Sequence, residues 1–256
     1  MGTRRISTLA DDTEQSPGED ASKVPVVALG ASAGGLESFQ RFFDALQDTP
    51  GVAFILIQHL APDHESLTPS LLARHTDMPS KAVTETTTIQ ANHVYVIAPD
   101  TELTLNDGKL EVGVRSNDAG HWRPIDRCFA SLAQARGADA VAIILSGTGT
   151  DGTEGASEVS MRGGLVLVQD PENASFPGMP EHAIKAGVAD YVMPVEDMPA
   201  WIIDHLHHSD GHNTISAIID RVPPCVESPG AWHCSISNAS PTTWSIWKRT
   251  PPNWIN

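Results

Sequence analysis

Short apolar runs alternate along the chain with segments in which apolar residues recur at helical spacing. The runs predict six strands, at Pro25–Gly30, Val52–His59, Asn92–Ala98, Ala140–Ser146, Gly164–Gln169 and Ala189–Met193. The helical patterns follow them, at Leu36–Leu46, Ser66–His75, Ile125–Arg136, Gly152–Met161, Pro180–Ala186 and Asp197–His205. Alternating strands and helices favour an α/β fold, a doubly wound, mostly parallel sheet with helices on both faces.

One segment departs from this alternation. Residues 102–112 form two runs of alternating apolar and polar residues on either side of Asn106-Asp107-Gly108, a sequence that favours a tight turn. We therefore predict an antiparallel hairpin at one edge of the sheet.

The composition changes at both ends of this pattern. Residues 1–23 are polar and lack periodicity, which predicts a disordered leader. Residues 24–206 carry the alternating pattern and are predicted to form one domain. Residues 207–256 hold four of the six tryptophans and no sustained period, so we expect a divergent tail that is disordered or read in a shifted frame.

Charge and hydropathy narrow the classes of partner. The net charge is -16, and a surface this acidic repels phosphate backbones and anionic lipids, so neither nucleic acid nor membrane is an expected partner. The chain has no apolar run long enough to cross a bilayer and no secretory signal, which predicts a cytoplasmic location. Three cysteines are too few for a disulfide framework.

The first predicted strand ends in a turn of small residues that carries one hydroxyl. Ser32 stands between Gly30 and Gly34 in a G-x-S-x-G pattern, just before a predicted helix. This arrangement presents a nucleophilic serine beside backbone N–H groups, but a strand, a glycine-rich turn and a helix also bind phosphate or simply pack. Both alternatives stay open for the turn alone.

Two further strand ends carry residues that would complete a catalytic site. His59 ends the second strand, and Asp151 follows the fourth in Gly147-Thr148-Gly149-Thr150-Asp151-Gly152. Carboxyl ends of neighbouring parallel strands converge on one crevice, so Ser32, His59 and Asp151 can meet as a Ser-His-Asp triad. Taken singly, the histidine also suits a structural role and the aspartate an Asx-turn or helix N-cap.

Several ordered motifs within residues 24–206 resemble the catalytic domain of the CheB-type protein-glutamate methylesterases of bacterial chemotaxis. The motifs are Gly30-Ala31-Ser32-Ala33-Gly34-Gly35, Gln58-His59, Val94-Tyr95-Val96-Ile97-Ala98-Pro99, Arg123-Pro124, Leu145-Ser146-Gly147-Thr148-Gly149-Thr150-Asp151-Gly152 and Phe176-Pro177-Gly178-Met179-Pro180. The resemblance implies a hydrolase without metal or cofactor that demethylates glutamate γ-methyl esters, and deamidates glutamine, on the cytoplasmic helices of methyl-accepting chemoreceptors.

The resemblance also assigns roles to residues. It makes Ser32 the nucleophile, His59 the base and then the acid, and Asp151 the orienting carboxylate. We look for oxyanion donors at Ala33 and Gly34 and in the turn of Gly147 and Thr148, where the family commonly has methionine at the position of Thr148. Arg123 is a candidate at the rim for substrate binding, with an ordinary salt bridge as its alternative.

Departures from the family concern the ends of the chain. The family usually carries a receiver domain ahead of the esterase, and residues 1–23 do not supply one. Asp63-His64-Glu65-Ser66 resembles proteins in which the esterase precedes a methyltransferase, which makes such a domain a possible partner. The histidine-rich segment has no zinc-binding spacing, so we expect no metal at Asp204, His205, His207, His208, Asp210 and His212.

Overall fold

The computed structural model describes residues 21–46, 50–59, 68–115, 122–209, 226–228 and 231–233. Residues 1–20, the Asp63–Ser66 motif, Asp210, His212 and most of the predicted tail lie outside the described residues. The described structure begins three residues before the predicted domain boundary. There Arg136 donates a hydrogen bond of 3.1 Å to the carbonyl of Ala21, which attaches this segment to the domain.

Seven parallel strands form the central sheet, in the order β10-β9-β8-β1-β2-β5-β3. Their bounds are β1 Val26–Ala31, β2 Ala53–Gln58, β3 Ser80–Val83, β5 His93–Ile97, β8 Val141–Ile144, β9 Leu165–Gln169 and β10 Tyr191–Met193. All six predicted strands are present, shifted by a few residues at their ends. The edge strand β3 was not predicted, because only one of its four residues is buried.

The centre of the sheet is the point where the strand order reverses. β1 pairs with β2 on one side, with Leu29 opposite Leu56, and with β8 on the other, with Leu29 opposite Ile143. In such sheets a crevice opens at the carboxyl ends of the strands beside the reversal. The residues that follow β1, β2 and β8 therefore face a common space.

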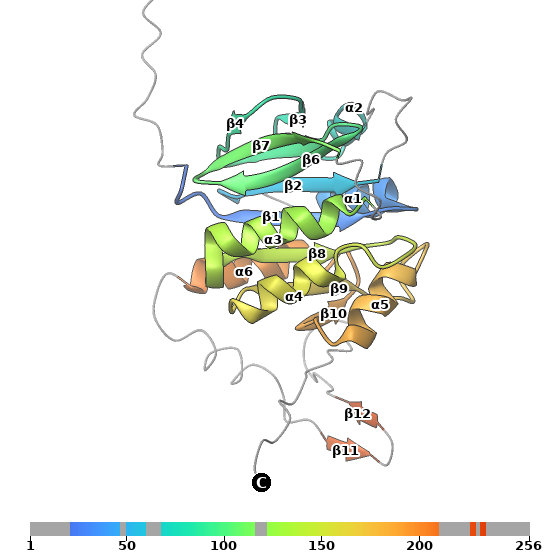
Figure 1. Ribbon diagram of the computed structural model, residues 1–256. Helices are drawn as coiled ribbons and strands as arrows, with labels where there is room; N and C mark the ends of the chain where they lie inside the picture. The colour runs from blue at the N-terminus through green and yellow to red at the C-terminus, as the bar shows by residue number, and fades with distance from the viewer. Residues whose placement is uncertain are drawn as a thin grey trace, which may run out of the picture.

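Helices cover both faces of the sheet (Figure 1). Their bounds are α1 Gly35–Asp44, α2 Thr68–Leu72, α3 Pro124–Arg136, α4 Thr153–Met161, α5 Gly178–Ala186 and α6 Met198–Ser209, with a 3-10 turn at Gly137–Asp139. Alternate strand residues face opposite ways: Val26 and Ala28 pack toward α3, α4 and α5, whereas Val27 and Leu29 pack toward α1, α2 and α6. The doubly wound fold follows from this two-sided burial.

The predicted hairpin forms, but it is not hydrogen-bonded to the central sheet. β6 (Thr101–Asn106) and β7 (Lys109–Val114) join β4 (Thr87–Thr88) in a separate antiparallel sheet, in the order β4-β7-β6. Positive φ angles at Asp107 and Gly108 make the tight turn. The inward side chains of Leu103 and Leu105 belong to the core on the α3 side, and the Leu105 N–H donates to Ser131 Oγ on α3 at 2.9 Å. The hairpin is therefore anchored on a helix.

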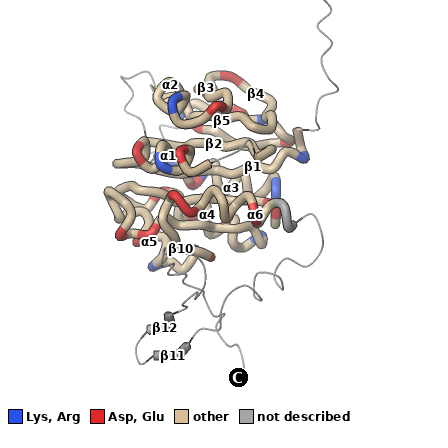
Figure 2. The backbone as a smooth tube through the Cα atoms, turned by 180° about the vertical axis from the view of Figure 1, so that it is seen from behind, with Lys and Arg blue, Asp and Glu red and all other residues tan. Residues whose placement is uncertain are grey.

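Two short strands lie beyond the central domain in the sequence. β11 (Val226–Ser228) and β12 (Ala231–His233), within the predicted tail, pair antiparallel. Acidic residues are spread over helices and loops rather than gathered into one patch (Figure 2). No helix in the described ranges has the length and hydropathy that a membrane span requires.

Candidate active site

Ser32 directly follows β1, in a turn whose backbone is held on both sides. Its N–H donates to the carbonyl of Ser146 at 3.0 Å, and its carbonyl accepts the N–H of Gly35 at 2.9 Å. Gly34 has φ +71°, and a Cβ there would lie 2.8 Å from Ser146 Oγ. Glycine is therefore required at this position by conformation and by space. The hydroxyl of Ser32 stands at the amino-terminal end of α1.

His59 directly follows β2 and reaches the hydroxyl of Ser32. Its Nδ1 lies 3.2 Å from Ser32 Oγ, and its Nε2 lies 3.0 Å from Asp151 Oδ2. For Nδ1 to accept the serine proton, the neutral ring must carry its own proton on Nε2, where the carboxylate accepts it. The Trp122 ring flanks the imidazole at a centroid distance of 5.6 Å. The three side chains predicted from separate strand ends thus form one continuous relay, the hydrogen-bonded chain from Ser32 Oγ through the His59 ring to Asp151.

Asp151 follows β8 and lies against the amino terminus of α3. Its Oδ1 accepts the N–H groups of Asp126 at 3.0 Å and of Gly152 at 2.9 Å, and its Oδ2 accepts that of Ile125 at 3.1 Å. The residue is 7% exposed. Backbone donors and the positive end of a helix stabilise a buried carboxylate and fix its direction. The same Oδ2 that accepts the Ile125 N–H also faces the imidazole.

A second carboxyl group lies beside Asp151. Asp126, in the first turn of α3, accepts the N–H of Gly155 at 2.8 Å and an Arg123 N–H at 3.1 Å. Burial and the charge of Asp151 raise the pKa of Asp126 to about 6, against the opposing effects of the Gly155 hydrogen bond and Arg123. Its charge therefore changes near neutral pH.

Arg123 is engaged within the protein. Its guanidinium contacts the carboxylates of Asp126 and Glu154 and donates to Thr150 Oγ1 at 3.2 Å. Arg123 thus makes the contacts of the salt-bridge alternative, and its role in substrate binding stays a prediction.

The other side of Ser32 is organised by neutral side chains. Ser146, fully buried after β8, donates from Oγ to the carbonyl of Ala33 at 2.9 Å and accepts the N–H of Phe176 at 3.0 Å. Its N–H donates to Oε1 of buried Gln169 at 2.8 Å. The same oxygen accepts a hydrogen bond from Ser38 on α1. These bonds join the nucleophile turn, β9 and the loop before α5.

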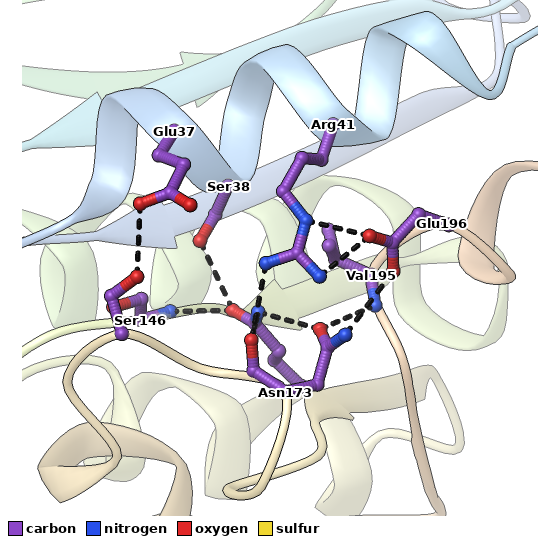
Figure 3. Close-up of polar contacts among 9 residues, drawn as sticks. Glu37, Ser38, Arg41, Ser146, Asn173, Val195 and Glu196 are labelled. Atoms are coloured by element: carbon purple, nitrogen blue, oxygen red, sulfur yellow. Dashed lines mark hydrogen bonds and ion pairs between the residues drawn. The ribbon is translucent and has the colours of Figure 1, made fainter.

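Figure 3 shows how this network continues to the periphery of the domain. Asn173 accepts the Val195 N–H at 3.1 Å through Oδ1 and donates to Glu196 at 3.3 Å. Arg41 on α1 donates to the same Glu196 and to the Asn173 carbonyl. Charged side chains enter this network at two places: Arg41 and Glu196 here, and Glu37 of α1, which accepts a hydrogen bond from Ser175 at 2.9 Å. The loop of residues 170–177 is thereby fixed against α1.

The predicted oxyanion donors differ in their availability. Within the described part of the chain, no acceptor engages the N–H groups of Ala33 and Gly34, and Thr148 is exposed. The N–H of Gly147 instead donates to the Phe176 carbonyl at 2.9 Å, and a role as oxyanion donor stays a prediction for Gly147. Gly147 is needed for space, since a Cβ there would lie 3.0 Å from Ser32 Cβ.

Sequence reasoning missed the residues that hold the relay in place. Ser146 and Gln169 are polar residues at the carboxyl ends of apolar runs, a signal that could have marked them as facing the crevice. Asp126 has the weaker signal of an acidic residue in a first helical turn. Among the described side chains, no group of three or more His, Cys, Asp or Glu is placed to hold a metal ion.

Comparison with known proteins gives consistent results. The model of the family described as CheB methylesterase matches residues 27–202. A protein-glutamate methylesterase/protein-glutamine glutaminase of Pyrococcus abyssi is 30% identical over 69% of this chain and 49% of its own length. An uncharacterised 104.1 kDa protein of Rhodobacter capsulatus is 42% identical over 54% of this chain and 14% of its own length.

The fold agrees with these matches. The crystal structure of the Thermotoga maritima CheB methylesterase catalytic domain superposes with a TM-score of 0.63 at 29% identity, covering 70% of this chain and 97% of that domain. The chain spans about half the length of the Pyrococcus relative and a smaller part of the Rhodobacter protein. Family match, fold and strand-end residues agree, and the chain belongs to the CheB methylesterase family.

Proposed function

We propose that the protein is a serine hydrolase that demethylates glutamate γ-methyl esters on the cytoplasmic helices of chemoreceptors and deamidates glutamine at such positions. The observation that carries the proposal is the relay from Ser32 Oγ through His59 to Asp151, with distances of 3.2 and 3.0 Å. The Pyrococcus abyssi relative, a protein-glutamate methylesterase/protein-glutamine glutaminase, supports the substrate class. A receptor substrate in turn places the protein in the cytoplasm.

The first half of the reaction forms an acyl-enzyme. His59 Nδ1 takes the hydroxyl proton as Ser32 Oγ attacks the γ-carbonyl carbon of the substrate. The N–H groups of Ala33 and Gly34 stabilise the oxyanion of the tetrahedral intermediate. As the intermediate collapses, the imidazolium donates its proton to the leaving methoxide, and methanol departs; ammonia leaves in the same way from a glutamine.

The second half regenerates the enzyme. His59 takes a proton from water, the resulting hydroxide attacks the glutamyl ester on Ser32, and the proton returns to the serine oxygen as the glutamic acid side chain is released; that carboxyl group then loses its proton to solvent. The carboxylate of Asp151 stabilises the transient imidazolium. The protein needs no oxidant, reductant or co-substrate other than water.

Methanol release from a methylated receptor fragment tests the proposal. Ser32→Ala removes the attacking atom, and we expect the rate to fall by about 10⁴-fold or more. Ser160→Ala, at an exposed position on α4, is the matched control and should keep the rate of the unmodified protein. Undiminished release by a folded Ser32→Ala variant would refute the assignment.

The alternative of a phosphate-binding module is not favoured. The hydroxyl of Ser32 contacts an imidazole, and that imidazole is paired with a buried carboxylate. A phosphate site has no need of such a relay, whereas a nucleophilic serine does.

The methyltransferase domain suggested by the sequence remains a proposed partner. Co-purification with a methyltransferase of the same organism would test this proposal.

A further inference from the structure

The amino termini of α3 and α4 are capped by each other's aspartates. Asp151, just before α4, accepts the N–H groups of Ile125 and Asp126 in the first turn of α3. Asp126 in turn accepts the N–H of Gly155 in the first turn of α4. Each helix leaves N–H groups unsatisfied at its start, and here the partner helix supplies the acceptor. The relay carboxylate is therefore attached to a two-helix corner.

The two helices touch at this corner. A Cβ on Gly155 would lie 2.5 Å from the Asp126 carbonyl oxygen and 2.7 Å from Phe129 Cβ, so the backbones approach too closely for any side chain there. Asp126 and Asp151 are both 7% exposed. Asp126 is thus linked to Asp151 by its own N–H, which donates to Asp151 Oδ1 at 3.0 Å, and its side chain is fixed at the contact between the two helices.

Four titratable side chains surround the carboxyl groups of Asp126 and Asp151. Arg123, at the start of α3, pairs with Asp126 and with Glu154 of α4. His59, after β2, faces the other side of Asp151. Cys128 is fully buried nearby, where burial and Asp151 raise its thiol pKa to about 12 and keep it neutral. Asp126, which lies next to Asp151, is consequently the carboxyl group whose pKa of about 6 lets it gain and lose a proton close to neutral pH.

We propose that Asp126 is a positioning residue of the triad, which holds Asp151 in line with His59 and places a second negative charge behind it. This inference rests on the proposed function, because it concerns the same hydrolytic site. When Asp126 is ionised, its charge favours the imidazolium; when Asp126 is protonated, that support is lost. Protonation of His59 and protonation of Asp126 each make the other less favourable. Activity therefore falls with decreasing pH over a wider range than one proton would produce.

The pH profile of kcat/KM tests the proposal. Asp126→Asn keeps an oxygen that accepts the Gly155 N–H but removes the charge. We expect the acid limb to narrow to a one-proton curve and its midpoint to fall by about half a pH unit or more. Asp139→Asn, an exposed position beyond the far end of α3, removes the same charge and should leave the profile unchanged. An unaltered profile for folded Asp126→Asn would overturn the proposal.

A second variant separates positioning from folding. Asp126→Ala also removes the acceptor for Gly155, so kcat should fall about tenfold at pH 8, while Asp126→Asn stays within about threefold of the unmodified protein. Equal kcat values for the two variants would argue against a positioning role. The same profiles measured as the rate of Ser32 labelling by a fluorophosphonate do not need a receptor. If labelling occurs without methanol release, the proposed function fails while this inference is still tested.

Discussion

The two sides of Ser32 are built from different chemistry. On the α3–α4 side, Asp151 and Asp126 are charged groups anchored on helix amino termini. On the α1–β9 side, Ser146 and Gln169 are neutral and fully buried, and they hold the turn by hydrogen bonds alone. In the proposed mechanism, the charged side stabilises the imidazolium of His59, whereas the neutral side adjoins the place where the oxyanion develops.

This division follows from electrostatics in a buried site. A carboxylate beside the oxyanion would oppose the charge that forms there, because charges interact strongly where water is excluded. Hydroxyl and amide groups fix the geometry without that penalty, provided that each polar atom has a partner. Charge changes are therefore confined to the α3–α4 side, whereas the α1–β9 side acts through geometry alone, and variants on each side should fail in different ways.

The largest effect is expected on the charged side. Asp151→Asn removes the acceptor for His59 Nε2–H, so the imidazole loses the tautomer and the charge stabilisation that it needs. We expect kcat for methanol release to fall by about 10³- to 10⁴-fold. Circular dichroism should show an intact fold, since the amide oxygen can still accept α3 N–H groups. A loss below tenfold would contradict the charged role of this side.

An intermediate effect is expected on the neutral side. Ser146→Ala leaves the Phe176 N–H without its acceptor and releases the Ala33 carbonyl. The free energy of unfolding should fall by about 1–3 kcal/mol in chemical denaturation, and kcat by about tenfold. The midpoint of the acid limb should not move, because no charge has changed. A displaced midpoint would break the distinction between the two sides.

The smallest effect concerns the pH dependence of stability. The pKa of Asp126, raised to about 6 from 3.8, lies above its unfolded value, so its favourable contribution is present at low pH and is lost as pH rises through about 6. Asp126→Asn has no such loss. Its free energy of unfolding should therefore increase by about 1 kcal/mol relative to that of the unmodified protein between pH 5 and pH 8, which means that the variant becomes relatively more stable. A constant difference in urea denaturation would refute the raised pKa.

The sequence predicted the elements whose signals are local. The apolar runs identified every strand of the central sheet except β3, and strand-end position located Ser32, His59 and Asp151. We predicted the hairpin at the edge of the central sheet, because alternating apolar and polar residues indicate a pair of strands but not the elements that the pair contacts. In the structure the pair contacts β4 and α3. The partners of Asp126 and Ser146 come from distant segments, Gly155 of α4 and the residues Ala33 and Phe176, and their identity could not be predicted from the local pattern around each residue.

The central claim is that Ser32 is the attacking atom of a Ser-His-Asp esterase. Mass spectrometry of the fluorophosphonate-treated protein locates that atom directly, because the reagent modifies a serine whose hydroxyl is activated by a base. The account predicts a single adduct on the peptide containing Ser32, which is lost in His59→Ala. An adduct on another serine, or an undiminished adduct at Ser32 in His59→Ala, would contradict it.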